Sequence, residues 1–503
     1  MNTSAFIPTG LLASSIGEIT ALVKTRRITA RRVLEMHIDR ISEVNSDVNA
    51  IVTLRTDEAL IEADAIDSRI KQGLDCGPLA GIPFTVKDII ATKGLRSTAG
   101  SKLLANYEPG LEAPAVARLR AAGAVLLGKS NCPEFALDMH TDNEVFGETH
   151  NPWNSKRTSG GSSGGDSAAV SSGCSVFGIG TDYGGSIRWP AHCTALVGLR
   201  ASNGLIPGTG QIPWTSASLL DRFQERTWLQ PPNSMSLQSQ LQKIAPIARY
   251  VTDVWTLLDV MRGPHPHDPS TVPVELGKPD NVGLRATRVA WCRGDGNIPV
   301  RTDILHALES VAISLSRMGL EVFEFLPEPI KYAERVFDDF RKADGLPDHE
   351  AIIGGKVDDI GANLREWLDS VEENCSVSRF RELAAESDAL RALMLDCFRD
   401  FDVLLLPVAS IPAFERNQPM MNVDDVSVPR FNILNCCRAI SVLNLPSLTV
   451  PAGTSRDGLP IGIQIVSAPY REHLSVAVAL AIEQSGSPWA RLANERNGSY
   501  PVE

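Results

Sequence analysis

The sequence predicts an α/β protein, and three observations support this fold class. From Gly81 onward, short apolar runs alternate with segments of helical periodicity, and Gly, Pro, Asn and Asp separate them. Such alternation of strands and helices is typical of a sheet covered by helices. With 503 residues, 43% of them hydrophobic and 21% charged, the chain has enough apolar material for a large buried core. We therefore expect a sheet that runs through most of the chain.

The elements follow one another in a clear order. Residues 14–73 place apolar side chains three to four positions apart, which predicts amphipathic helices and an N-terminal helical wrap over residues 1–75. The core at 76–210 contains the runs PFTV, AVLLG and VFGIG as strands, with APAVARLRAA and SAAVSSG as helices between them. We expect residues 211–242 and 325–400 to be insertions or a cap. Residues 401–485 return to the sheet through DVLLLPVAS, PSLTVPAG and LPIGIQIVS, and end in the helix-like HLSVAVALAIEQ.

Composition excludes several classes of partner. The 48 basic and 60 acidic side chains give a net charge of −12, and no run of five Lys or Arg occurs. A nucleic-acid or anionic-membrane surface is therefore not expected. No 18 consecutive residues are apolar, the N-terminus lacks a basic signal-peptide region, and the nine cysteines show no zinc-site spacing. We expect a cytoplasmic protein with reduced thiols, no metal and no cofactor, and a homodimer stays open.

Two short motifs match catalytic patterns without the context that these patterns need. GAVLLGKS, residues 123–130, fits the phosphate-binding pattern GxxxxGK[ST], but its middle residues are themselves an apolar strand. GGSSG, residues 160–164, fits the nucleophile-elbow pattern GxSxG, but the polar segment NSKRTS precedes it instead of a buried strand. We therefore expect neither a nucleotide site nor an α/β-hydrolase elbow.

A lysine, paired serines and a glycine turn carry the remaining chemistry. Lys87 ends the strand PFTV, where a lysine is either a solvated surface group or a half-buried base. Ser162 and Ser163 stand between glycine pairs, and Ser186 closes TDYGGS directly after the strand VFGIG. The backbone N–H groups of the four residues 183–186 can converge on an anion there. Acyl transfer needs a nucleophile, a base, a proton route and oxyanion donors, and this set supplies all four.

These residues match a known family. The segment GGSSGGDSAAVSSGCSVFGIGTDYGGS and its continuation to residue 210 resemble the signature of the amidase signature family, serine amidohydrolases, and GIPFTVKD resembles that family's catalytic-lysine segment. The resemblance extends over GKSNCPEFA, FGETHNPWN, LNLPSLTVPAG and LPIGIQIVS, and covers about residues 14–265 and 400–485. It implies a single domain, residues 1–503, with a central mixed β-sheet flanked by helices.

The resemblance also implies roles for individual residues. Ser186 would be the nucleophile, Ser162 the cis-serine that relays protons, and Lys87 the base, while the amides of Tyr183, Gly184, Gly185 and Ser186 would form the oxyanion hole. Ser163, Asp182 and Arg188 would orient this site, although Asp182 and Arg188 could equally pair only to stabilise the turn. Asp138 and His140 occupy a segment that lines the acyl pocket in relatives.

Three departures from the family pattern bear on the substrate. Ser159 replaces a frequent Pro, and Trp189 and His192 follow the nucleophile turn where other residues are usual; we expect His192 to be packed in the core. Residues 211–242 replace a short loop and carry Trp214, which could cover an acyl group, lie in an interface, or simply pack.

The sequence leaves the function open at the level of substrate. The leading hypothesis is an amidohydrolase that cleaves a small aryl or alkyl carboxamide through an acyl-enzyme on Ser186. The alternatives are the glutaminase subunit of a tRNA-dependent amidotransferase, which uses the same triad, and an esterase or hydrazidase.

Overall fold

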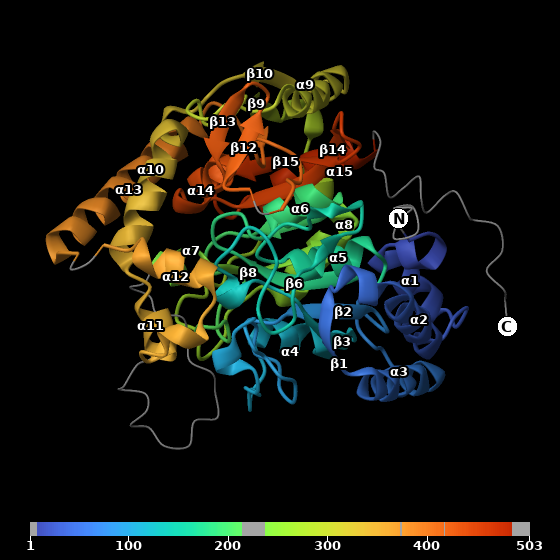
Figure 1. The fold of residues 1–503 in the computed structure, drawn as a ribbon. Helices are drawn as coiled ribbons and strands as arrows, with labels where there is room; N and C mark the ends of the chain where they lie inside the picture. The colour runs from blue at the N-terminus through green and yellow to red at the C-terminus, as the bar shows by residue number, and fades with distance from the viewer. Residues whose placement is uncertain (1–7, 214–236, 373–374, 417, 485–503) are drawn as a thin grey trace.

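An eleven-stranded mixed sheet runs through the middle of the computed structural model, which describes residues 8–213, 237–372, 375–416 and 418–484 (Figure 1). Strand β2 pairs in parallel with β3 and β6, strand β9 pairs in parallel with β10 and β11, and the other pairs are antiparallel. The order across the sheet is β1 (Ile51–Leu54), β3 (Val125–Ser130), β2 (Pro83–Lys87), β6 (Phe177–Asp182), β8 (Lys243–Ala248), β7 (Val197–Arg200), β14 (Ser447–Thr454), β15 (Pro460–Ser467), β11 (Val403–Pro407), β9 (Arg288–Trp291) and β10 (Glu321–Glu324).

The parallel strands β2, β3 and β6 are buried along their whole length. Strands covered on both faces read as continuous apolar runs, and this is why PFTV, AVLLG and VFGIG are visible in the sequence. Phe84 of β2 and Phe177 of β6 stack with their ring centroids 5.0 Å apart. Residues 125–130 are strand, so the GxxxxGK[ST] match forms no phosphate-binding turn.

Helices cover both faces of the sheet, which confirms the predicted α/β class. In contact with its strands are α5 (Gly164–Ser171), α6 (Arg188–Thr194), α8 (Val251–Met261), α9 (Thr302–Arg317) and α15 (Glu472–Gln484). Helix α4 (Pro114–Ala121) packs on α8, and α7 (Leu237–Leu241) and α14 (Asn435–Val442) pack on α10 (Glu328–Asp344). Two small hairpins, β4 (His150–Asn151) with β5 (Asn154–Thr158) and β12 (Met420–Val423) with β13 (Val426–Pro429), complete the strands. Strand β5 precedes GGSSG in a partly exposed hairpin, so the buried strand of a nucleophile elbow is not in that place.

The N-terminal segment wraps one end of the sheet with α1 (Ile16–Lys24), α2 (Ala30–Val48) and α3 (Thr56–Lys71) (Figure 1). Helix α1 begins with a capping box in which the Ser15 hydroxyl accepts from the Glu18 N–H and Glu18 accepts from the Ser15 N–H. The segment is not purely helical, because β1 lies between α2 and α3 and pairs antiparallel with β3 at the sheet edge.

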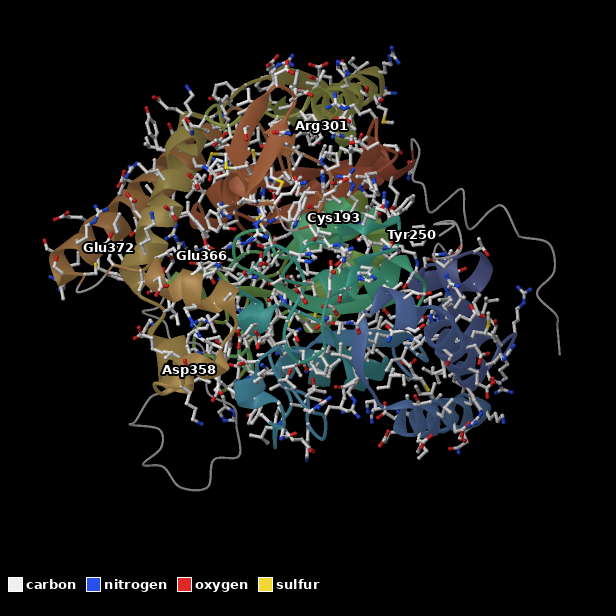
Figure 2. All side chains as sticks on the ribbon, viewed as in Figure 1. Cys193, Tyr250, Arg301, Asp358, Glu366 and Glu372 are labelled. Atoms are coloured by element: carbon white, nitrogen blue, oxygen red, sulfur yellow. The ribbon has the colours of Figure 1, made fainter. Side chains whose placement is uncertain are left out.

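The described residues between 325 and 400 form a group of helices, hereafter the cap: α10 (Glu328–Asp344), α11 (Pro347–Ile353), α12 (Ala362–Asp369) and α13 (Val377–Cys397). The cap lies on the opposite side of the molecule from α1–α3, and Glu366 and Asp358 mark it in Figure 2. Of the predicted insertion at 211–242, residues 214–236 lie outside the described residues. No helix within the described ranges is long and apolar enough to cross a bilayer.

Candidate active site

The turn of residues 183–187 carries Ser186, the predicted nucleophile, and is hereafter called the nucleophile turn; it leaves the end of β6 and enters α6. Asp182, the last residue of β6, accepts hydrogen bonds from the backbone N–H groups of Gly185 at 3.0 Å and Ile187 at 3.1 Å. Gly185 has φ +123°, and a Cβ atom there would lie 2.9 Å from the Cβ of Cys437, so only glycine fits. The carboxylate and the glycine together fix the path of the chain on which Ser186 is presented.

One of the four backbone amides predicted for the oxyanion hole already has a hydrogen-bond acceptor within the protein. The Gly185 N–H is bonded to Asp182, and Gly185 is not among the residues that line the cavity beside Ser186. Within the described part of the chain, the amides of Tyr183, Gly184 and Ser186 have no hydrogen-bond acceptor. All three of these residues line a cavity, so the turn offers three amide donors instead of four.

Lys87 lies at the end of β2 with its ammonium among three hydroxyl groups. Its Nζ donates to Ser162 Oγ at 2.7 Å, to Thr181 Oγ1 at 2.9 Å and to Ser163 Oγ at 3.1 Å. The side chain is completely buried. Burial lowers the pKa of Lys87 well below its ordinary value, because the charged form loses its hydration. A neutral amine within hydrogen-bond distance of a serine hydroxyl can accept that hydroxyl's proton.

The loop of residues 159–163, hereafter the serine loop, contains two glycines that allow it to lie close to the cavity. Gly160 has φ +88°, and the peptide bond between Gly161 and Ser162 is cis. A Cβ atom on Gly161 would lie 2.5 Å from the carbonyl carbon of Met139. The next residue, Ser163, donates its backbone N–H to the carbonyl oxygen of Ser186 at 3.2 Å, which ties the serine loop to the nucleophile turn.

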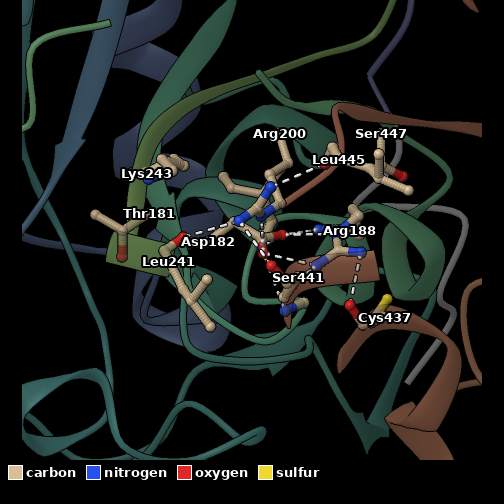
Figure 3. A network of polar contacts seen from close by, with 12 residues as sticks. Thr181, Asp182, Arg188, Arg200, Leu241, Lys243, Cys437, Ser441, Leu445 and Ser447 are labelled. Carbon is tan, nitrogen blue, oxygen red and sulfur yellow. Dashed lines mark hydrogen bonds and ion pairs between the residues drawn. The ribbon is translucent and has the colours of Figure 1, made fainter. Parts of the chain in front are cut away.

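A buried ion pair between Asp182 and Arg188 stabilises the nucleophile turn (Figure 3). Arg188 donates to both carboxylate oxygens of Asp182, at 2.9 Å from Nη2 and 3.0 Å from Nε, and both side chains are fully buried. Burial alone would raise the pKa of Asp182, but the two arginines Arg188 and Arg200 lower it to about 2. Arg200, which sequence reasoning did not single out, lies 3.7 Å from the same carboxylate.

The Arg188 side chain also hydrogen-bonds helix α14. The Arg188 guanidinium donates to the carbonyl of Cys437 at 3.0 Å and to Ser441 Oγ at 2.7 Å, and both residues belong to α14 (Figure 3). The predicted pairing of Asp182 with Arg188 is therefore present, and it links the nucleophile turn to a helix some 250 residues later in the chain.

A cavity of about 380 Å³ opens beside Ser186. The lining residues come from the segment 136–139, the serine loop and the nucleophile turn on one side. On the other side they come from the cap, from the segment before α14 and from α14 itself. Among the lining residues are Gly161, Tyr183, Gly184, Ser186, Asp138, Phe337, Arg341, Trp367, Arg430, Phe431 and Arg438.

The predicted pocket residues have different outcomes. Asp138 lines the cavity. His140 is not among the lining residues: its Nδ1 hydrogen-bonds Thr158 Oγ1 at 2.8 Å and its Nε2 lies 3.0 Å from Glu148. His192 is packed in the core, as predicted, with Nδ1 against the backbone of Gly462. Trp214 lies outside the described residues.

Sequence reasoning missed several groups at this site. Thr181 contacts Lys87 directly, and its place in TDYGGS, five residues before Ser186, was the available signal. The cap arginine Arg341 and the α14 residue Arg438 carried no signal in the sequence. Across the described ranges, no group of three or more His, Cys, Asp or Glu side chains is arranged to hold a metal ion.

The chain is similar to known proteins over most of its length. A family model described as Amidase matches residues 32–476. The chain is 29% identical over 506 residues to the A subunit of the glutamyl-tRNA(Gln) amidotransferase of Thermosynechococcus vestitus, covering 95% of this chain and 98% of that protein. Two solved structures are also similar. A bacterial aryl acylamidase is 28% identical with a TM-score of 0.80, covering 97% of this chain and 99% of that one. A 6-aminohexanoate cyclic dimer hydrolase complexed with substrate is 26% identical with a TM-score of 0.80, covering 96% and 98%.

Proposed function

Because this chain belongs to the amidase family, whose chemistry is cleavage of amide C–N bonds, we propose that it is a free-standing hydrolase of small aryl or alkyl carboxamides. The products would be a carboxylate and ammonia or an amine. The observation that carries this proposal is the 2.7 Å contact between the buried Lys87 Nζ and Ser162 Oγ, next to the turn that presents Ser186 to the cavity.

In the first half of the proposed reaction, Ser186 Oγ attacks the amide carbonyl carbon. Its proton passes through the Ser162 hydroxyl to the neutral amine of Lys87, so one O–C bond forms while the carbonyl π electrons move to oxygen. The resulting oxyanion accepts hydrogen bonds from the free amides of the turn. Such preorganised donors stabilise negative charge most strongly where water is excluded.

In the second half, the intermediate collapses and the C–N bond breaks. The Lys87 ammonium returns its proton through Ser162 to the leaving nitrogen, which departs as ammonia or an amine and leaves an ester on Ser186. Water then attacks this ester with the same proton relay and releases the carboxylate. The hydroxyls of Thr181 and Ser163 keep the Lys87 Nζ aimed at Ser162 throughout.

Release of the leaving group by the purified chain alone tests this proposal: ammonia from primary amides and glutamine, an aniline from anilides and hydrazine from hydrazides. The panel contains aliphatic amides, aromatic amides, anilides, hydrazides and glutamine, and Ser186→Ala is the control. Turnover of an aryl or alkyl amide without a partner, absent in Ser186→Ala, is the expected result. If no amide in the panel is hydrolysed above the Ser186→Ala background, the proposal is wrong.

A second candidate function is the glutaminase component of a tRNA-dependent amidotransferase. The 29% identity to the A subunit of such an amidotransferase, over 95% of the chain, favours it. A glutaminase component passes ammonia to a partner, so this alternative predicts release from glutamine alone, or turnover that appears only after a partner is added. The same panel therefore separates the two candidates.

A further inference from the structure

We infer that the substrate of this site carries a carboxylate in addition to its amide, and that Arg438 is the residue that binds it. This inference rests on the proposed amide hydrolysis and specifies its substrate class. It follows from the position of Arg438 in the cavity and from the charges of the groups around it.

Arg438 extends from α14 past the nucleophile turn. Its Cγ atom lies 3.5 Å from where a Cβ of Gly184 would stand, so the side chain touches the segment that supplies the oxyanion donors. Its guanidinium lies over the ring of Phe431 and donates to the Phe431 carbonyl. Arg438, Gly184 and Ser186 all line the same cavity, so a ligand group bound to Arg438 is held close to the reacting carbonyl.

Three arginines line this cavity, and they differ in how their charges are compensated. Arg341 donates to Asp338 Oδ1 at 2.8 Å and to Ser370 Oγ at 2.9 Å, so it is already engaged. Arg430 is 28% exposed and lies 3.6 Å from Asp138. Arg438 is buried, and within the described ranges the nearest carboxylate is that of Glu334, 4.0 Å away. Arg438 is therefore the cavity cation with the weakest ionic partner.

A buried guanidinium with a weak partner is a costly arrangement unless a ligand completes it. Burial lowers the pKa of Arg438 to about 9, because the charged form loses its hydration. Burial also raises the pKa of Glu334 above its ordinary value. A carboxylate on the substrate would form charge-assisted hydrogen bonds to the guanidinium fork and supply the missing negative charge.

The acidic groups of the cavity do not replace that carboxylate. The Asp138 oxygens accept from the Met139 N–H at 2.6 Å and from Asn363 Nδ2 at 2.5 Å, and Glu366 is exposed to solvent. The remaining lining includes the aromatic rings of Phe337, Trp367 and Phe431, which can contact the apolar body of a substrate. The cavity thus fits an aryl or short alkyl amide with an acidic substituent.

The helix that presents Arg438 is also the helix that holds the nucleophile turn. The adjacent residue Cys437 and the later Ser441 accept hydrogen bonds from Arg188, which is paired with Asp182. The distance between the cation and Ser186 is thereby set by buried polar contacts, which suits recognition of a carboxylate at one defined separation from the amide.

The test compares matched pairs of amides, terephthalamate against benzamide and succinamate against butyramide, in wild type, Arg438→Gln and Arg335→Gln. The ratio of the two kcat/KM values within a pair does not depend on the fraction of folded enzyme. We expect wild type to prefer the carboxylate amides by about 10-fold or more, and Arg438→Gln to lose about 10-fold or more of that preference. Arg335 is half-exposed on α10 and lies outside the cavity, so Arg335→Gln removes the same charge and should leave the ratio unchanged.

A wild-type preference for the neutral amides, or an equal ratio in wild type and Arg438→Gln, would overturn the inference. So would an equal loss in Arg335→Gln, because the effect would then reflect net charge. If Arg438→Gln does not fold, Arg438→Lys keeps the charge without the planar fork, and an intermediate ratio is expected.

A binding measurement separates this inference from the proposed function. Calorimetric titration of terephthalamate and of benzamide into Ser186→Ala, with and without Arg438→Gln, requires no turnover. Suppose that wild type hydrolyses no amide, but that Ser186→Ala binds the carboxylate amide more tightly and loses this preference when Arg438 is also replaced. This result would refute the amidase proposal and support the anion site. Turnover of amides with no such difference in binding would refute the anion site and support the amidase.

Discussion

Asp182→Asn should lower the free energy of unfolding by about 3–5 kcal/mol at neutral pH, because it leaves two buried arginines without their carboxylate. Part of this loss follows from the pKa of Asp182. A shift from the ordinary 3.8 to about 2 corresponds to about 2 kcal/mol of stability. The rest reflects the desolvated guanidinium of Arg188, which loses a bidentate acceptor.

The pH dependence of this contribution has a definite sign. The pKa of Asp182 is lower in the folded than in the unfolded chain, so its stabilisation is fully present above about pH 4 and is lost as pH falls toward 2. The difference in stability between wild type and Asp182→Asn should therefore shrink below pH 4. Urea unfolding followed by far-UV circular dichroism, at several pH values, measures it.

Asp253→Asn is the matched control. Asp253 is also buried, but burial raises its pKa to about 8, and its Oδ1 accepts the Ile16 N–H at 2.9 Å, which an asparagine oxygen can also do. Since its folded pKa is raised, the carboxyl destabilises the folded chain above about pH 4, and the amide should be neutral or stabilising at pH 7. Equal losses in Asp182→Asn and Asp253→Asn would refute the reasoning.

Three further predictions concern the reaction and the loop geometry. Ser186→Ala should abolish turnover while the free energy of unfolding stays within about 0.5 kcal/mol of wild type, since Ser186 lines the cavity instead of the core. Activity of this variant at the wild-type rate would exclude Ser186 as the nucleophile. Lys87→Met should lower kcat by about 10²-fold or more. In wild type, the lowered pKa of Lys87 favours the neutral amine at higher pH, so kcat/KM should fall at acidic pH as this amine becomes protonated. A flat pH profile down to pH 5, or near-wild-type kcat in Lys87→Met, would show that another group is the base. Gly161→Ala should lower the free energy of unfolding by about 1–3 kcal/mol, because its Cβ would lie 2.5 Å from the Met139 carbonyl carbon. Gly17→Ala in α1 is the control and should raise the free energy of unfolding by about 0.5–1 kcal/mol, because the space around Gly17 is open. If urea unfolding shows Gly17→Ala to be the less stable of the two variants, the described loop is wrong.

The sequence by itself determined those strands, helices and candidate site residues that a short local pattern of residues predicts. Strands buried on both faces must be apolar over their whole length, so β2, β3 and β6 were visible as runs of residues, and the connecting helices by their periodicity. Lys87, Ser162 and Ser186 could be named because glycine-rich turns and a strand-end lysine are local features. Rejecting the GxxxxGK[ST] match also needed only local context, since an apolar strand cannot turn around a phosphate.

The tertiary structure alone decided what surrounds these residues. The Gly185 amide proved to be occupied by Asp182, and His140 proved to contact Glu148 instead of the cavity. Arg438 and Arg200 join the site from segments that are distant in the chain, and nothing near them in sequence marks them. Packing of α14 and the cap against the rest of the chain removes water from around these guanidinium groups. Because charges interact more strongly where water is excluded, the energy of each arginine depends on the neighbouring charges that the fold brings to it. Local patterns, together with the family resemblance, thus predicted the candidate triad, whereas long-range packing determined its electrostatics and the cavity beside Ser186.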